Sequence, residues 1–300
     1  MLRHATYKVL LMVELPETHV LSKQISQELT GKTILNVTVN ANPHKFAWYS
    51  GMSHSGEQQT DISDLYNKRL AGRKITGANP GTGYTCGGNT EIICDDMLLV
   101  ISTPIKYHGP GGKLPAKHQL LVEFDDSSHM SCTVQMWGSM LCYSLSENEL
   151  PEDFAANRRP DPLTDDFNEA YFERLWRDEK PSLSAKALLA TEQRIPGLGN
   201  GVLQDILFNA RIHPKRKLQT MGDADMEKLF SSIKSTLKDM KDYGGRDTER
   251  DLFNRNGEYQ TILSKNTVKY PCRVCGWDLV RQAYMGGNIY FCPVCQPLGG

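Results

Sequence analysis

Near the start of the chain, hydrophobic residues recur at helical spacing. Apolar residues stand at every fourth position, at Leu21, Ile25 and Leu29, and Gly31 follows the last of them. This spacing predicts a helix of about three turns that begins near Glu17 and ends at the glycine.

Beyond residue 36 the pattern changes to alternation of apolar and polar residues, which is typical of strands with one buried face. Segments 91–94 and 97–102 flank a turn at Asp95 and Asp96, and segments 120–124 and 130–136 flank another turn. The first half is therefore expected to consist mainly of hairpins. In the last of these segments Cys132 lies on the apolar face, and Ser131 lies on the polar face.

Helical spacing returns in the second half of the chain. Pro151, Pro160 and Pro162 interrupt segment 151–165, which we interpret as an interdomain linker because proline can continue neither a strand ladder nor a helix. Four helices are expected after it. They are a helix marked by Phe167, Tyr171 and Leu175, a helix at 183–193 capped by Ser182, and helices at 200–210 and 226–240.

Composition restricts the class of protein further. The chain has 300 residues with 39% hydrophobic side chains, which indicates about two folded domains and excludes a disordered protein. No apolar run is long enough to span a membrane, and the first eleven residues lack a signal-peptide cleavage site, so we expect a cytoplasmic protein. The net charge of −1 conceals +5 over residues 211–300 and −6 before them. The basic C-terminal third is either compositional drift or an anion-binding face.

The eight cysteines form two groups. Dispersed Cys86, Cys94, Cys132 and Cys142 lack ligand spacing, and we interpret them as small buried residues. The other four form two C-x2-C pairs separated by sixteen residues, at Cys272, Cys275, Cys292 and Cys295. This spacing predicts one structural zinc ion bound by four thiolates. Two disulfides are the alternative, which a reducing cytosol disfavours. The zinc should hold a small hairpin whose tip lies near residues 285–288.

A glycine-rich junction lies between two of the predicted helices, at residues 195–201. Its glycines permit a tight backbone turn, and the next helix is expected to begin at Asn200 with its amides pointing outward. Free amides at a helix N-terminus favour a phosphate ligand. An ordinary helix-turn-helix without any ligand is the alternative.

Three motifs together resemble one protein family. These are the Met-Val-Glu-Leu-Pro-Glu-Thr stretch at 12–18, the Gly-Leu-Gly-Asn-Gly junction at 197–201 and the C-terminal cysteine pairs. Their order and spacing are similar to those of the formamidopyrimidine-DNA glycosylase and endonuclease VIII family.

The resemblance implies an α+β fold. An N-terminal helix and β-sandwich domain would be followed by a helix-two-turn-helix domain with a zinc-ribbon finger. The expected boundaries are a leading extension at 1–11, which is not translated if synthesis starts at Met12, a catalytic domain at 12–150, the linker at 151–165, the helical DNA-binding domain at 166–265 and the finger at 266–300.

The resemblance also implies an activity, which is excision of oxidised bases from DNA followed by strand cleavage through a Schiff base on the N-terminal amine. Carried onto this sequence, the nucleophile is Val13, the acid is Glu14, and Glu17 matches a second acidic position. Asn200, with the neighbouring backbone of Gly199 and Gly201, corresponds to a phosphate grip. An α-amine suits nucleophilic attack because its pKa of about 8 leaves part of it neutral at pH 7.

The chain departs from the family pattern in several places. Val13 replaces the usual proline, and it becomes an N-terminal amine only if translation starts at Met12, which we favour over a start at Met1. No lysine occurs over residues 88–91, and residues 135–138 lack the arginine of the family's void-filling loop. Met136 or Trp137 would fill the void instead, unless both belong to the core.

At the finger tip, Gly287 or Asn288 replaces an arginine of the family, and Asn288 is the expected DNA contact. Fewer basic contacts predict weaker, less salt-dependent DNA binding.

Three hypotheses follow, in descending order. The first is a glycosylase with abasic-site lyase activity. The second is a catalytically degenerate protein that binds damaged or abasic DNA. The third is a zinc-ribbon adaptor without nucleic acid, which leaves the N-terminal motif unexplained. Under the first two, we expect a monomeric bacterial protein at the nucleoid, with damaged DNA as its partner and no membrane association.

Overall fold

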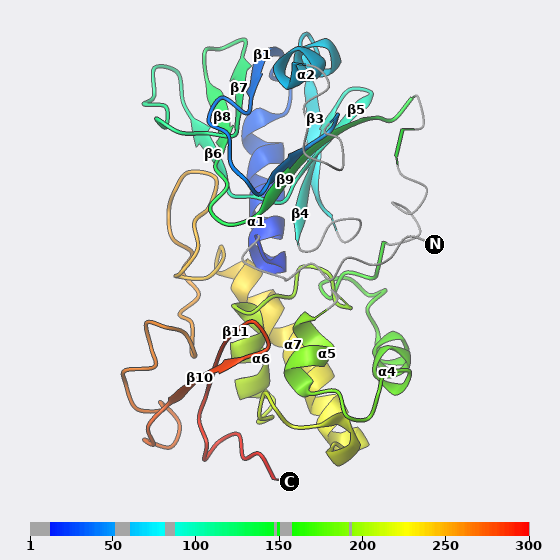
Figure 1. Cartoon of the computed structure of the whole chain (residues 1–300), viewed down its shortest axis with the longest axis vertical. Coiled ribbons are helices and arrows are strands. Elements are labelled where there is room, and N and C mark those ends of the chain that lie inside the picture. Colours follow the sequence, from blue (N-terminus) through cyan, green and yellow to red (C-terminus); the bar gives the residue numbers. More distant parts are fainter. Residues whose placement is uncertain are drawn as a thin grey trace.

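The computed structural model describes residues 13–51, 61–81, 88–146, 149–150, 158–191 and 194–299. It has a strand-rich N-terminal half and a helical C-terminal half, stacked along the long axis (Figure 1). This arrangement confirms the predicted α+β fold with a β-sandwich, a helix-two-turn-helix region and a four-cysteine finger. The leading extension, Met12, Cys86 and residues 151–157 at the start of the linker fall outside the described residues.

Helix α1 (Leu15–Leu29) contains the predicted helix and extends it by two residues at its start. Pro16 occupies the first turn, where a missing N–H costs nothing, and Gly31 follows the end with φ +90°. The predicted apolar stripe is buried, which confirms the spacing argument. The sequence reading missed α2 (Ile62–Leu70), whose first turn is capped by the carboxylate of Asp61.

Two antiparallel-rich sheets form the sandwich. One has the order β1-β7-β8-β6, and the other has the order β2-β9-β5-β4-β3. The strands are β1 (Ile34–Val39), β2 (Ala47–Tyr49), β3 (Ile75–Gly81), β4 (Asn89–Cys94), β5 (Met97–Ile101), β6 (Ile105–His108), β7 (Leu120–Phe124), β8 (His129–Cys132) and β9 (Gly138–Ser144). Both predicted hairpins are confirmed, since Cys94 pairs with Met97 and Val122 pairs with Met130.

The cysteines of the sandwich are core residues, as predicted. Cys94, Cys132 and Cys142 are buried, and burial raises the pKa of each thiol. The expected solvent-facing side of β8 is wrong at Ser131, which is buried in a strand that lies between β7 and β6. A hydrogen bond of 2.8 Å between its hydroxyl and the ring of His108 on β6 satisfies the buried polar group.

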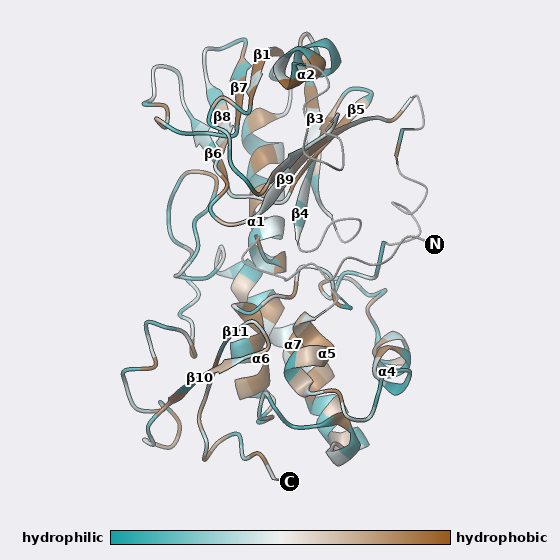
Figure 2. Cartoon of the chain, in the orientation of Figure 1, coloured by the Kyte–Doolittle hydropathy of each residue, from teal (hydrophilic) through white to brown (hydrophobic). Residues whose placement is uncertain are grey.

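The C-terminal half contains α4 (Glu169–Arg177), α5 (Ala185–Ala190), α6 (Val202–Asn209), a short 3-10 turn (Leu218–Thr220) and α7 (Asp223–Asp242). Two expected boundaries are wrong. Helix α5 is capped by Ser184, whose hydroxyl accepts the amide of Ala187, and not by Ser182. Helix α6 begins at Val202 and not at Asn200. Figure 2 shows apolar residues concentrated on α5, α6 and the central strands. Within the described part of the chain, no helix has the length and apolar character needed to cross a membrane.

The finger is a hairpin of β10 (Val280–Tyr284) and β11 (Gly287–Phe291). Its turn contains Met285 and Gly286, at φ 49° and 75°, where the tip was predicted. The segment between α7 and this finger runs back to the N-terminal half (Figure 1). There Leu252 is buried in the sandwich core, and its carbonyl accepts the amide of Tyr107 at 2.8 Å.

Candidate active site

The N-terminus of α1 lies where the two halves of the molecule meet. The amide of Leu15 donates to the carbonyl of Gly197 in the glycine-rich junction at 2.8 Å. Val13 is partly buried and packs against the sandwich core. A Cβ on Gly88 would lie 2.8 Å from the Val13 carbonyl oxygen, so three distant segments approach at backbone contact distance. The resemblance-based nucleophile position is therefore at the domain junction.

Glu14 occupies the centre of this junction and is only 7% exposed. Its Oε1 accepts the amide of Gly201 at 2.8 Å, and its Oε2 accepts the amide of Val202 at 2.7 Å. Burial raises the pKa of Glu14, although Arg246 and the two amides oppose this rise. A carboxyl with a raised pKa can carry a proton nearer to neutral pH, as a general acid must.

These contacts correct the expectation of free amides at the glycine-rich junction. The carboxylate of Glu14, from another domain, occupies the amides of Gly201 and Val202 that a phosphate would use. The glycines are needed for the same reason. A Cβ on Gly199 would lie 2.3 Å from Glu14 Oε1, and a Cβ on Gly201 would lie 1.7 Å from Arg246 Nη1. Glycine is therefore required here by a buried ionic cluster.

Glu17 is also buried, at 5% exposure, one helical turn after Glu14. Its carboxylate binds the guanidinium of Arg246 through two bonds, Nε to Oε1 at 2.9 Å and Nη2 to Oε2 at 2.8 Å. The third nitrogen of Arg246, Nη1, lies 3.0 Å from Glu14 Oε2. The structure brings the two predicted acids together around Arg246, which no local sequence pattern indicates, because this ion pair joins residues 229 positions apart.

The structure brings the predicted DNA-binding residues Asn200 and Asn288 close together through Gln204. The Gln204 side-chain amide donates to the carbonyls of Asn200 at 3.0 Å and Asn288 at 3.1 Å, and it accepts the amide of Tyr290 at 3.0 Å. A Cβ on Gly287 would lie 2.8 Å from the Asn200 side-chain nitrogen. The buried amide oxygen of Asn200 has no hydrogen-bond partner among the described residues.

Two basic residues that the sequence did not indicate, Lys186 and Arg281, contact the hairpin. Arg281 donates to the side chain of Asn288 at 3.2 Å, so an arginine does reach the finger tip. Lys186 on α5 is buried and donates to the carbonyl of Tyr284 at 2.6 Å, and burial lowers its pKa to about 8. Neither motif spacing nor local charge indicates that these side chains converge, because they come from separate elements.

Residues 135–138, which the resemblance matches to the family's void-filling loop, carry an aromatic stack. Trp137 packs on Phe46 with ring centroids 4.3 Å apart and an interplanar angle of 23°. Trp137 and Met136 are both partly exposed, so the alternative that both are core residues is wrong. In place of the family's lysine near residues 88–91, the buried Glu91 binds Arg158 at 2.7 Å.

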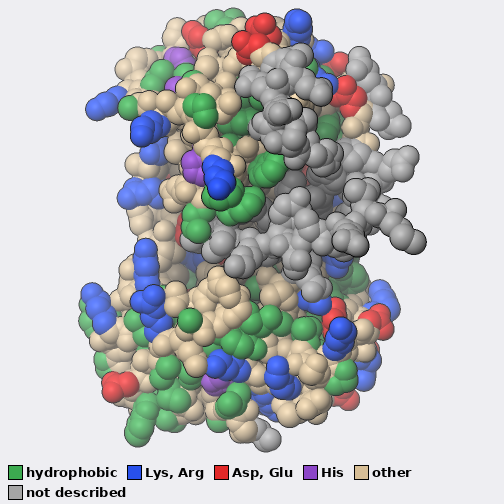
Figure 3. All heavy atoms as spheres, viewed as in Figure 1, with side chains coloured by type: hydrophobic (Ala, Val, Ile, Leu, Met, Phe, Trp, Pro, Cys, Tyr) green, Lys and Arg blue, Asp and Glu red, His purple; other side chains and the backbone are tan. Residues whose placement is uncertain are grey.

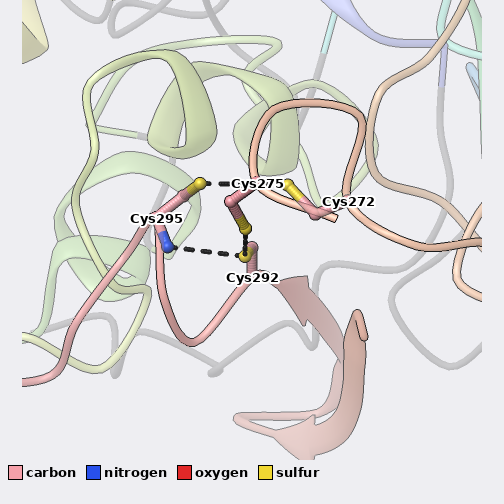
Figure 4. Close-up of side chains that lie close together, drawn as sticks. All are labelled: Cys272, Cys275, Cys292 and Cys295. Carbon is pink, nitrogen blue, oxygen red and sulfur yellow. Dashed lines mark hydrogen bonds between the residues drawn. The ribbon is translucent and has the colours of Figure 1, made fainter. Parts of the chain in front are cut away.

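The four cysteines of the finger form a zinc site (Figure 4). All four sulfur atoms lie within 4.8 Å of one another, with Cys272 and Cys295 at 3.8 Å and Cys275 and Cys292 at 3.4 Å. Zinc–sulfur bonds of about 2.3 Å in a tetrahedron place sulfurs about 3.8 Å apart, so the thiols fit this ion. Four protein ligands leave no open coordination position, which indicates a structural ion.

Figure 3 shows the outer surface around the junction. Lys and Arg side chains lie on both halves of the face drawn, above and below the indentation at its left edge. Positive charge on both sides of an indentation is favourable for a polyanionic ligand.

Residues 159–250 match the family model described as the formamidopyrimidine-DNA glycosylase H2TH domain. The formamidopyrimidine-DNA glycosylase of Oceanobacillus iheyensis is 26% identical over 296 residues, covering 95% of this chain and 98% of that protein. The protein of the same name from the Wolbachia of Culex pipiens is 27% identical over 293 residues, covering 95% and 100%.

Solved structures show the same fold. Lactococcus lactis Fpg in complex with DNA containing N7-benzyl-Fapy-dG aligns with a TM-score of 0.76 and 22% identity, covering 95% of this chain and 99% of that one. The complex of the Lactococcus protein with abasic-site DNA aligns equally well, at a TM-score of 0.76 and 23% identity over the same shares.

Proposed function

The chain belongs to the formamidopyrimidine-DNA glycosylase family, and we propose that it removes oxidised bases from damaged DNA and then cleaves the strand. The observation that carries this proposal is the placement of Glu14. It follows Val13 directly, is buried at the junction of the two halves, and is bound to the amides of α6. Known relatives of this fold bind damaged and abasic DNA.

In the proposed reaction, the nitrogen of Val13 attacks C1′ of the damaged nucleotide as its N-terminal amine. The new C–N bond replaces the bond to the base, which departs. Glu14 supplies a proton to the deoxyribose ring oxygen, and ring opening leaves a Schiff base. Elimination from this Schiff base breaks a C–O bond and expels a backbone phosphate, which cleaves the strand. A primary amine is chemically sufficient for this step.

DNA would be held by both halves of the molecule. We propose that the side chain of Asn200, with Gly199 beside it, and the finger tip at Asn288 contact the phosphate backbone. The proximity of the two residues supports this assignment, because the side-chain amide of Gln204 donates to the carbonyls of both Asn200 and Asn288. The amide of Gly201 is already bound by Glu14, so its proposed part is to allow the close approach of the chain.

A pair of otherwise identical proteins tests the nucleophile. One form begins at Val13 after removal of Met12, and the other begins at Met1; N-terminal sequencing verifies each. We expect borohydride to trap a covalent adduct with abasic-site DNA only in the form that begins at Val13. A Glu14→Gln variant of that form should lose base excision while still binding DNA. Failure of the Val13 form to be trapped would refute the enzymatic proposal.

A second candidate is a protein that binds damaged or abasic DNA without catalysis. One observation favours it, since both oxygens of Glu14 are already bound by backbone amides and Arg246, as in a purely structural carboxylate. This candidate predicts preferential binding of abasic-site over intact duplex by the Val13 form, with no trapped adduct.

A further inference from the structure

One arginine lies between the two acids of the candidate site. The side chain of Arg246 is only 4% exposed, and it binds Glu17 through two nitrogens and Glu14 through the third. The backbone amide of Arg246 also donates to Glu17, at 3.1 Å. All hydrogen-bonding edges of the guanidinium toward α1 are therefore used, and the planar fork fits this geometry as a lysine ammonium would not.

The fold holds this arginine rigidly, although it belongs to the segment after α7 and not to the N-terminal half. The chain leaves α7 through Gly244 and Gly245, both at positive φ (69° and 100°). A Cβ on Gly257 would lie 2.1 Å from the backbone of Gly245, so the later part of this loop packs directly on the turn at Gly244 and Gly245. Further along, Asp251 accepts the side chain of Gln24 of α1 at 3.0 Å.

Around Glu14, acidic side chains outnumber the basic side chain of Arg246 that neutralises them. Glu14, Glu17 and the half-buried Glu249 surround a single cation, and Arg246 Nη2 lies 3.9 Å from Glu249. Burial and the two neighbouring acids raise the pKa of Glu249 to about 7, although Arg246 opposes this rise. Without Arg246 the buried carboxylates would repel one another, and Glu14 Oε2 would keep only its bond from the amide of Val202.

We propose that Arg246 is a positioning residue for the acid of the reaction: Glu17 anchors its guanidinium, and the guanidinium in turn orients Glu14 and stabilises its anion. Glu17 therefore acts through Arg246 and does not contact DNA. The loop after α7 then controls the acid of the N-terminal half. Apolar replacements of buried ion pairs are often neutral or stabilising, so stability alone does not explain why this ion pair is buried here. The assignment rests on the proposed function for its kinetic consequence.

The experiment compares Arg246→Met, Arg246→Lys and Glu17→Gln with the wild type, all beginning at Val13. Arg255→Met is the matched control, since Arg255 lies in the same loop, pairs with Asp251 at 2.8 Å and is 67% exposed. We expect kcat for base excision to fall about tenfold to a hundredfold in Arg246→Met with little change in KM, and less in Arg246→Lys. Arg255→Met should match the wild type.

The pH profile separates positioning from mere structure. Glu14 must be protonated to act as an acid, so activity declines as pH rises through its pKa. Loss of the cation raises that pKa further, and the alkaline limb of the Arg246→Met profile should move to higher pH. An unshifted limb with wild-type kcat would overturn the assignment.

A readout independent of activity keeps the two proposals distinguishable. If the wild type neither excises bases nor is trapped by borohydride, the proposed function fails. The carbon-13 titration of the Glu14 carboxyl then decides the role of Arg246. We expect its midpoint to move upward in Arg246→Met, which removes a neighbouring cation, but not in Arg255→Met. An unmoved midpoint in Arg246→Met overturns the assignment in either case.

Discussion

Alanine at position 201 should disrupt the ionic cluster without removing any of its charges. The added Cβ would lie 1.7 Å from Arg246 Nη1 and 2.9 Å from Glu14 Oε2. Ordinary contact begins near 3.4 Å, so the guanidinium must retreat by about 1.7 Å or the backbone of the junction must move. The first movement breaks the 3.0 Å contact of Arg246 with Glu14, and the second breaks the 2.8 Å bond from the Gly201 amide.

The size of the effect follows from the burial of the cluster. Separation of one partner from a buried ion pair costs about 3–5 kcal/mol. Arg246 keeps its two bonds to Glu17, so we expect the lower end of that range, a loss of about 3 kcal/mol in the free energy of unfolding. For a chain of this size, the unfolding temperature should fall by roughly 6–12 °C.

Urea and thermal unfolding of the zinc-loaded proteins measure this loss. Gly109→Ala is the control, because a Cβ at Gly109 meets nothing within 4 Å. The double variant Gly201→Ala, Arg246→Met should be less destabilised than the sum of the two single variants, because the side chain that clashes is gone. A Gly201→Ala protein within about 0.5 kcal/mol of the Gly109→Ala protein would refute the steric reasoning.

Two further predictions concern the finger and its attachment. Elemental analysis should find one zinc per chain; Cys272→Ser should lose the metal and DNA binding, whereas Cys142→Ser should keep both, and unchanged metal in Cys272→Ser would contradict the site. Asp205 is fully buried, accepts the amides of Ile262 and Leu263, and has a pKa raised by burial from 3.8 to about 6. The folded state therefore holds an extra proton between about pH 4 and 6, and roughly 3 kcal/mol of stability present below pH 4 is lost as pH rises through 6. Urea midpoints at pH 4.5 and 7 should differ less in Asp205→Asn, and an unchanged difference would contradict this prediction.

Local patterns predicted much of the fold. The stripe of α1 and the hairpin at Asp95 and Asp96 are both as expected, because spacing reports which face of an element is buried. The pattern could not indicate that Ser131 is buried, since a neighbouring strand supplies its partner His108. The cysteine spacing predicted the zinc site because all four ligands lie in two short turns.

The candidate site was only partly predictable. Motif resemblance located Glu14, Glu17 and Asn200, but it assigned the glycines to phosphate and missed Arg246. The contacts that correct this reading join α1 to residues about 187 to 229 positions later, and no local pattern reports such pairs. Electrostatic partners of distant origin become visible only in three dimensions.

The burial of Leu252 in the sandwich core has a consequence for synthesis of the protein. During translation, the N-terminal strands leave the ribosome long before residue 252, so the sandwich remains without one of its core side chains until most of the chain has been made. Truncation before this residue should leave a cavity in the sandwich core and deprive the amide of Tyr107 of its carbonyl acceptor. The core of the N-terminal half thus includes a residue from the C-terminal half, and the two halves complete their folding together.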